Sequence, residues 1–260
     1  MKVSVIGCGN LGSAVVKGLL AEGYDLVACD KDEDALAALP ESDRINKTKD
    51  SSVAVQEGEV VILAVKPKVA GAVLDSFELE EGQVLASFAA AVSLEFLREN
   101  ARGGAQVVRV MPNLAGEYNK MAAAVSPPGE VPENVQRILG DLGSYVEIDE
   151  SLMDIATAVN GSGPAFVFYA MKAMKEAGVE GGLDEDAAET LTAQTFSGAA
   201  AIVNNDDRSL DELIEAVCSP GGTTIEGMEV LREADAGEPF VEAVAAAERR
   251  SEEITEELDL

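Results

Sequence analysis

The sequence predicts an α/β protein whose first half forms a doubly wound, mainly parallel β-sheet and whose second half is entirely helical. Three observations lead to this fold class. Short Val- and Ile-rich runs alternate with amphipathic Ala- and Leu-rich stretches through the first part of the chain. These runs are predominantly apolar, as expected of strands buried on both faces of a sheet. Beyond residue 150, helical periodicity persists and no strand-like alternation follows.

The expected elements of the first half follow in chain order. A strand is expected where a short apolar run is bounded by turn residues, and a helix where apolar residues recur every three to four positions. The expected strands are 3–6, 25–29, 60–65, 84–88 and 106–111, with 121–126 and 145–148 completing the sheet. The expected helices are 10–22, 32–39 and a segment after Pro67 that ends near Leu74.

The second half carries long Ala-rich stretches at helical spacing. The expected helices are 152–178, 184–204, 210–217, 223–233 and 239–257. The Gly-Ser-Gly-Pro segment 161–164 should end one helix and start another, because Pro favours the first helical turn. We therefore expect a sheet domain over 1–149 and an all-helical domain over 150–260. The apolar surface of these helices predicts burial against a second copy, as a homodimer or an assembly of dimers.

Composition and charge exclude several classes of protein. The 260-residue chain is 47% hydrophobic but has no apolar run of the ~18 residues that a membrane span needs. Met1 and the residues after it lack a signal-peptide pattern, so we expect a cytoplasmic protein. The formal net charge of −29 disfavours nucleic acid and anionic membranes as partners. Because the acid is spread along the whole chain, we expect a halophilic protein whose self-repulsion is screened by molar salt.

The chemistry-bearing residues are few. Histidine is absent, which removes imidazole general bases and most transition-metal sites. Cys8, Cys29 and Cys218 lie far apart, so neither a disulfide framework nor a zinc site is expected, and no metal is. Acid–base chemistry must therefore use Lys, Asp, Glu, Tyr, Thr, water or the substrate itself.

A glycine-rich turn directly follows the first expected strand and opens the first expected helix. It reads Gly7, Cys8, Gly9, Asn10, Leu11 and Gly12. This is the dinucleotide-binding arrangement, in which Gly7 makes the tight turn, Gly9 admits the pyrophosphate and Gly12 lets helix pack on strand. The alternative is a plain glycine turn.

Further candidate cofactor residues end the other strands at the same edge of the sheet. Asp30 could bind the ribose 2′-hydroxyl, whereas the adjacent Lys31 could serve a 2′-phosphate, so both NADH and NADPH stay open. Asn113 could hold the nicotinamide or simply close a turn. After the apolar run 60–65 come the remaining cofactor candidates, namely Val65, Lys66 and Pro67. Lys66 could equally steer an anionic substrate or be a solvated loop lysine.

Segment 219–227, Ser-Pro-Gly-Gly-Thr-Thr-Ile-Glu-Gly, combines two glycines and two threonines at a helix start. Free backbone N–H groups and the positive end of the helix dipole would suit a small carboxylate with a polar group beside it. The alternative is an ordinary helix start with a threonine as N-cap.

Together these motifs resemble the pyrroline-5-carboxylate reductase family along essentially the whole chain. The matching pieces are the 7–12 turn, 64–68, 109–113, 161–166 and, most specifically, 218–227. The resemblance implies a Rossmann domain, an interleaved helical dimerisation domain, and NAD(P)H-dependent reduction of 1-pyrroline-5-carboxylate to L-proline. It further implies that the substrate binds at Ser219, Gly221, Gly222, Thr223 and Thr224. By resemblance, the Thr224 hydroxyl contacts the ring nitrogen and is the catalytic candidate.

Some positions depart from the family pattern. Leu114 and Ala115 follow the asparagine of 109–113 where the family has Thr-Pro, and Ala91 stands at a usual glycine. Asp207 and Lys172 replace family acids, which leaves their roles open along with that of Lys66.

Two alternative functions remain at this point. One is a small dehydrogenase of the beta-hydroxyacid type, for which Lys172 or Lys175 could donate a proton. The other is a non-catalytic dinucleotide-binding sensor.

Overall fold

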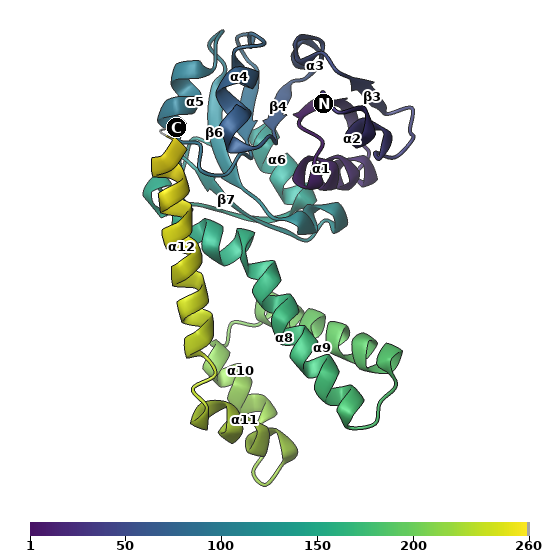
Figure 1. Ribbon diagram of the computed structural model, residues 1–260, viewed down its shortest axis with the longest axis vertical. Helices are drawn as coiled ribbons and strands as arrows, with labels where there is room; N and C mark the ends of the chain where they lie inside the picture. The colour runs from purple at the N-terminus through teal and green to yellow at the C-terminus, as the bar shows by residue number, and fades with distance from the viewer. Residues whose placement is uncertain (259–260) are drawn as a thin grey trace. The chain divides into compact units, whose positions relative to one another are not determined.

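An eight-stranded sheet organises the first part of the chain, and its strand order is β3-β2-β1-β4-β5-β6-β7-β8. The computed structural model describes residues 1–258 (Figure 1). All neighbouring strands are parallel except β6 and β7, which are antiparallel. The strands are β1 (Lys2–Ile6), β2 (Asp25–Cys29), β3 (Ile45–Thr48), β4 (Val60–Leu63), β5 (Val84–Ser87), β6 (Gln106–Met111), β7 (Met121–Ser126) and β8 (Gly143–Glu147). The predicted doubly wound, mainly parallel sheet is confirmed.

Helices cover both faces of this sheet, and a separate apolar core lies on each side. On one face are α1 (Asn10–Ala21), α2 (Glu33–Ala37) and α6 (Glu133–Leu142). On the other are α3 (Ser51–Glu57), α4 (Ala70–Leu74) and α5 (Leu94–Asn100). Leu19 and Leu139 are fully buried in the first core, and burial of one leucine stabilises the fold by about 2 kcal/mol.

Short turns connect these elements. The 3-10 turns are η1 (Pro67–Val69), η2 (Leu114–Tyr118) and η3 (Glu150–Leu152). The short helix α7 (Met153–Ala156) then leads into the π-helical turn η4 (Thr157–Gly161).

The order of the strands places a crevice beside β1. From β1 the chain moves outward to β2 and β3, then returns to the other side of β1 as β4. The connections after β1 and β4 therefore diverge at their carboxyl ends, which is where sheets of this type bind ligands.

The edge strand β3 was not anticipated from the sequence. Its residues Asn46, Lys47 and Thr48 give almost no apolar signal. The strand pairs only with β2, and a lysine on such an edge is a common protection against pairing with another chain.

The chain divides into two compact units, Met1–Ser162 with the residues from Ala245 onward, and Gly163–Val244. The helices from residue 163 onward are α8 (Gly163–Glu180), α9 (Glu185–Asn205), α10 (Leu210–Val217), α11 (Thr223–Glu233) and α12 (Glu238–Leu258). This confirms the helical prediction. The predicted domain boundary at 149/150 marks the change from strands to helices, whereas the unit limits follow the contacts within the chain. The boundary therefore stays a prediction.

Within residues 163–244 only Ala188 and Thr192 are buried. Large apolar side chains such as Phe168 and Tyr169, 65% and 75% exposed, cover these helices instead. The second unit thus has little core of its own.

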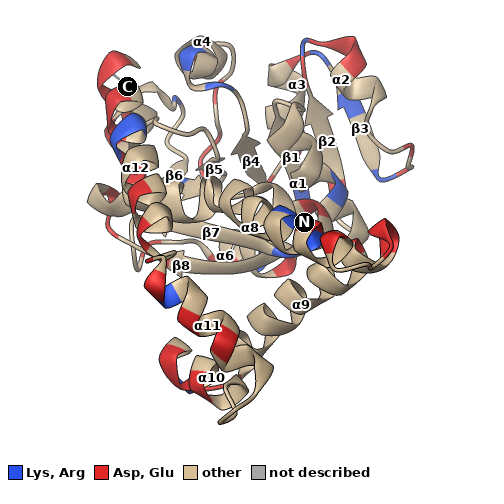
Figure 2. Cartoon of the chain, turned by 60° about the horizontal axis from the view of Figure 1, so that its bottom comes forward, with Lys and Arg blue, Asp and Glu red and all other residues tan. Residues whose placement is uncertain are grey.

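Acidic side chains lie on the outer elements. Figure 2 shows Asp and Glu on α10, α11 and α12 and around α2, with few on the strands. Among residues 1–258, the buried charged side chain is Arg109 on β6. Over the same residues, no helix combines the length and apolarity needed to cross a bilayer.

Two helical glycines provide a matched test of this packing. A Cβ on Gly18 of α1 would lie 2.1 Å from the Gly116 carbonyl oxygen, whereas a Cβ on Gly140 of α6 meets nothing within 4 Å. We expect Gly18→Ala to lower the free energy of unfolding by about 1–3 kcal/mol through overpacking. Gly140→Ala should raise it by up to about 1 kcal/mol through helix propensity. Urea titrations at one salt concentration would measure both, and equal effects would contradict the close approach at Gly18.

Candidate functional site

The glycine turn after β1 has the geometry that a dinucleotide requires. Gly7 has φ +95°, and a Cβ there would lie 2.5 Å from the Ala64 carbonyl oxygen. A Cβ on Gly12 would lie 1.8 Å from the Gly7 carbonyl oxygen, so both positions are restricted to glycine. A Cβ on Gly9 meets nothing within 4 Å. The space beside Gly9 therefore lets a pyrophosphate approach the backbone.

The N-terminus of α1 is electrostatically suited to the same group. Gly9 is its N-cap and provides no side-chain hydrogen bond, and the first turn holds no acidic residue. The first backbone N–H groups of a helix have no partner within the helix. With the helix dipole they attract an anion, so the turn fits the dinucleotide diphosphate.

Asp30 follows β2, and its carboxylate is fixed beside the glycine turn. Its Oδ2 accepts a hydrogen bond from the Cys8 N–H at 2.6 Å, and its Oδ1 accepts one from the Asp32 N–H at 3.0 Å. Asp30 lines a pocket of about 190 Å³ together with Gly7, Lys31 and Lys49. The sequence-predicted residues Gly7, Cys8 and Asp30 thus lie together.

The thiols near this pocket are unreactive. Burial is the main cause that raises the pKa of Cys8 to about 12 and that of Cys29 to about 11. Both thiols therefore stay protonated at neutral pH. Cys8 contributes to the turn through its backbone N–H rather than its sulfur.

The residues after β4 border a second hollow at the same edge of the sheet. Lys66 and Pro67 line a cleft of about 660 Å³, together with Ala91, Thr157 and Ser162. Val65 instead lines the smaller pocket beside Asp30. Leu11 is half-buried and packs against the core, whereas Asn10 is exposed in the first turn of α1. The cofactor roles of these residues stay predictions.

One wall of the cleft was missed by sequence reasoning. Residues Ala247, Ser251, Ile254 and Leu258 of α12 line it. The Ser251 hydroxyl donates a hydrogen bond to Asp154 Oδ1 at 2.6 Å and holds this part of α12 against α7. The helical spacing of the four residues was the available signal, because it places them on one face.

Asn113 is engaged by the protein itself. Its Oδ1 accepts hydrogen bonds from the Ala115 N–H at 3.2 Å and the Ala122 N–H at 3.4 Å. Its Nδ2 donates to the Asn160 carbonyl at 3.2 Å. The side chain therefore closes the turn into η2, one of its two expected roles. Its contact with a nicotinamide stays a prediction.

In the second unit, the 219–227 loop opens α11 without a side-chain cap. Gly222 is the N-cap, and its N–H donates to the Ser219 carbonyl at 2.9 Å. Gly221 adopts φ +69°, which favours glycine. The ordinary start capped by a threonine side chain is therefore not what forms here. Thr223 and Thr224 stand in the first turn, where the backbone N–H groups lack partners within the helix.

The lysines considered as proton donors are held by carboxylates. Lys175 Nζ lies 2.6 Å from Glu189 and 3.0 Å from Glu185, and these hydrogen bonds raise its pKa to about 12. Lys172 is exposed and lies 3.7 Å from Glu176. A lysine so stabilised in its charged form is a weak proton donor. Asp207 lies exposed between α9 and α10.

Ala91 carries backbone strain at the cleft and provides a test of it. It is buried with φ +56°, a conformation that costs a residue with a Cβ about 1–2 kcal/mol. We expect Ala91→Gly to raise the free energy of unfolding by up to about 1 kcal/mol, since relief of strain exceeds the added chain entropy. Ala90→Gly is the control and should lower it by about 0.5–1 kcal/mol. Denaturant unfolding would compare them, and equal losses would refute the strain at Ala91.

Comparison with known proteins places this geometry in a family. The protein-family model "Pyrroline-5-carboxylate reductase dimerisation" matches residues 150–254, and the family model "NADP oxidoreductase coenzyme F420-dependent" matches residues 2–91. The pyrroline-5-carboxylate reductase of Methanosarcina acetivorans is 36% identical over 263 residues, which cover 97% of each chain.

Solved structures agree over a similar length. A pyrroline-5-carboxylate reductase from Coxiella burnetii is 30% identical with TM-score 0.84, covering 96% of this chain and 97% of that one. Plasmodium falciparum pyrroline carboxylate reductase with NADP bound is 26% identical with TM-score 0.83, covering 98% of both. With sequence and fold shared along nearly its whole length, the chain belongs to the pyrroline-5-carboxylate reductase family.

Proposed function

We propose that this protein reduces 1-pyrroline-5-carboxylate to L-proline with NADH or NADPH, the last step of proline biosynthesis. The near full-length likeness to reductases of this name carries the proposal. The glycine turn at β1 and the uncapped start of α11 support it, because the reaction needs a dinucleotide and an anionic substrate. A beta-hydroxyacid dehydrogenase is less favoured, since its proton donor would be the carboxylate-bound Lys175 or the exposed Lys172.

The residues can be given roles consistent with this chemistry. The bound dinucleotide supplies a hydride. The turn from Gly7 to Gly12 holds its diphosphate, and Asp30 faces its adenosine ribose. The backbone N–H groups at Gly221 and Thr223, with the Ser219 hydroxyl, bind the substrate carboxylate, and Gly222, whose N–H is held by the Ser219 carbonyl, shapes the turn around it.

Thr224 takes the remaining role. Its hydroxyl hydrogen-bonds the ring nitrogen and orients the imine. One hydride at carbon and one proton at nitrogen complete the reduction of the C=N bond. A cyclic imine is protonated readily, so a protein without histidine can support this step.

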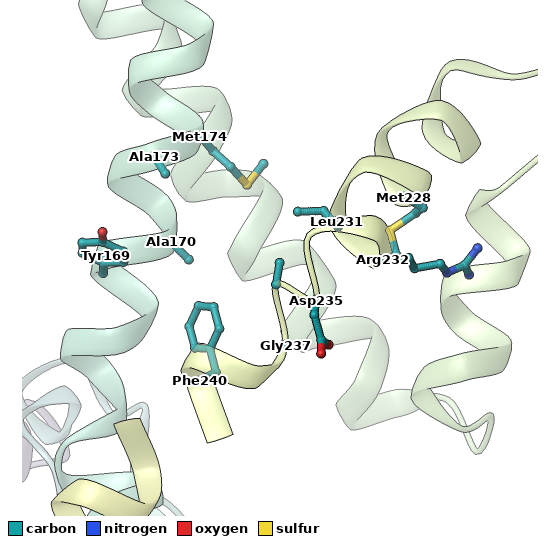
Figure 3. A pocket seen from close by; sticks show the side chains of 11 residues that line it. Tyr169, Ala170, Ala173, Met174, Met228, Leu231, Arg232, Asp235, Gly237 and Phe240 are labelled. Atoms are coloured by element: carbon teal, nitrogen blue, oxygen red, sulfur yellow. The ribbon is translucent and has the colours of Figure 1, made fainter. Parts of the chain in front are cut away.

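We further propose that the protein acts as a homodimer. Residues of α8, α11 and α12 line an apolar pocket of about 660 Å³ in the second unit. Figure 3 shows Phe240 and Leu231 directed across this pocket toward Ala170 and Met174. A second copy would bury these surfaces, which supports the proposal because the unit has little core of its own.

The setting of the proposed reaction is the cytoplasm of a salt-adapted cell. The net charge of −29 supports this, because so dense a charge destabilises a compact chain unless salt screens it. We retain the proposed domain boundary at 149/150, with the family match beginning at residue 150 as its support.

The activity can be tested directly. Purified protein should oxidise NADH or NADPH when 1-pyrroline-5-carboxylate is added, with higher activity at high salt than in dilute buffer. No turnover with either cofactor at any salt would refute the proposed function. Full activity in dilute buffer would refute only the salt adaptation.

Thr224 can be tested in the same assay. Thr224→Ala should lower kcat by about tenfold or more, since it removes a hydrogen bond to the reacting imine. Thr224→Ser retains the hydroxyl and should keep most of the activity. NADH affinity, measured by fluorescence titration, should be unchanged in both, and a parallel loss of cofactor binding would contradict the assigned role.

The homodimer is tested by mass. Light scattering at high salt should give twice the chain mass of 27.1 kDa, or a multiple of the dimer. Phe168→Glu should shift the protein toward monomer, because it places a charge on the exposed apolar surface of α8. The control Val53→Glu, at an exposed position of α3 in the first unit, should leave the mass unchanged. A monomeric wild-type mass would overturn the proposal.

A further inference from the structure

The pocket beside Asp30 has one apolar wall and one charged wall. Val65, Val69 and Val73 form the apolar wall, and Asp30, Lys31 and Lys49 supply the charges. An apolar slot next to polar groups suits an adenosine, whose base is flat and whose ribose carries hydroxyls. Whether these charges attract or repel a 2′-phosphate decides between NADPH, which carries one, and NADH, which does not.

The carboxylate of Asp30 is held in place by the backbone. Each of its two oxygens accepts one backbone hydrogen bond, Oδ2 from the Cys8 N–H and Oδ1 from the Asp32 N–H. Within residues 1–258 no lysine or arginine forms an ion pair with it. A carboxylate so placed accepts a hydrogen bond from a ribose hydroxyl and repels a phosphate at the same position.

Neither Lys31 nor Lys49 supplies a fixed positive charge that would offset the carboxylate of Asp30. Lys49 Nζ forms an ion pair with Glu33 on α2, so its positive charge is already compensated by a carboxylate of the protein. Lys31 is exposed, and fixing so flexible a side chain on a ligand costs conformational entropy. The charge held in place at this pocket is therefore the negative one of Asp30.

We propose that the protein binds NADH in preference to NADPH, with Asp30 as the specificity residue and Glu33 withholding Lys49 from a 2′-phosphate. The inference rests on the dinucleotide site of the proposed function and deepens it by choosing the cofactor. Asp30 acts directly on the ribose, and Glu33 acts only through Lys49.

Binding without substrate tests the role of Asp30. Isothermal titration of the full chain at fixed high salt should give an affinity for NAD⁺ about tenfold or more above that for NADP⁺. Asp30→Ser should remove most of this difference, and Asp30→Asn, which keeps the side-chain shape, should reduce it in the same direction. Circular dichroism would confirm that both variants fold.

Three outcomes separate the inference from the proposed function. Equal or tighter binding of NADP⁺ by the wild type would overturn the inference and leave the function intact. An unchanged ratio in both folded Asp30 variants would also overturn it. Failure of the wild type to bind either dinucleotide would contradict the proposed function itself.

A matched pair of variants tests Glu33. Glu33→Gln should raise the NADP⁺ affinity by about threefold and leave that for NAD⁺ unchanged, in line with the modest strength of exposed ion pairs. Glu41→Gln is the control, because Glu41 pairs with Lys47 at 2.7 Å, and Lys47, two residues before Lys49, does not line the pocket. Adding Lys49→Ala to Glu33→Gln should cancel the gain. If Glu33→Gln behaves like Glu41→Gln, the role given to Glu33 is wrong.

Discussion

The structure depends most on one close backbone contact. The glycine turn after β1 and the first turn of α1 pack directly against the residue that follows β4. Gly7, Gly12 and Ala64 meet there at distances that leave no room for a Cβ on either glycine. This contact seats the N-terminus of α1 at the carboxyl ends of the two central strands. The anion-attracting end of the helix, the carboxylate of Asp30 and the residues after β4 are consequently gathered at one edge of the sheet.

Away from this point, part-buried polar contacts tie β6 and β7 to the segment that follows the sheet. Arg109 on β6 pairs with Glu150 at 3.1 Å, and Glu150 also accepts the Leu94 N–H at the start of α5. The Asn160 side chain donates to the Met111 and Ala122 carbonyls and secures the π-helical turn against β6 and β7. Through these contacts the segment that leads to Ser162, a residue of the cleft wall, is held against the sheet.

The second unit follows a different physical rule from the first. Its helices begin and end within about two residues of where the sequence predicts, yet they bury almost no residue completely. Helices of this length are stabilised mainly by packing of their apolar faces, which supports the proposed homodimer.

Local patterns in the sequence determined most of the elements, the glycine turn at residue 7 and the helix start at residue 223. Each depends on residues only a few positions apart. Tertiary structure alone decided that Asp30 is fixed by the Cys8 N–H, that Glu33 captures Lys49 and that Ser251 brings α12 to the cleft. The tertiary structure also determines the positive φ of Ala91 and the pairing of the weakly apolar strand β3 with β2. Such features depend on contacts across tens of residues, which the packing of the sheet and its helices creates and no local periodicity encodes.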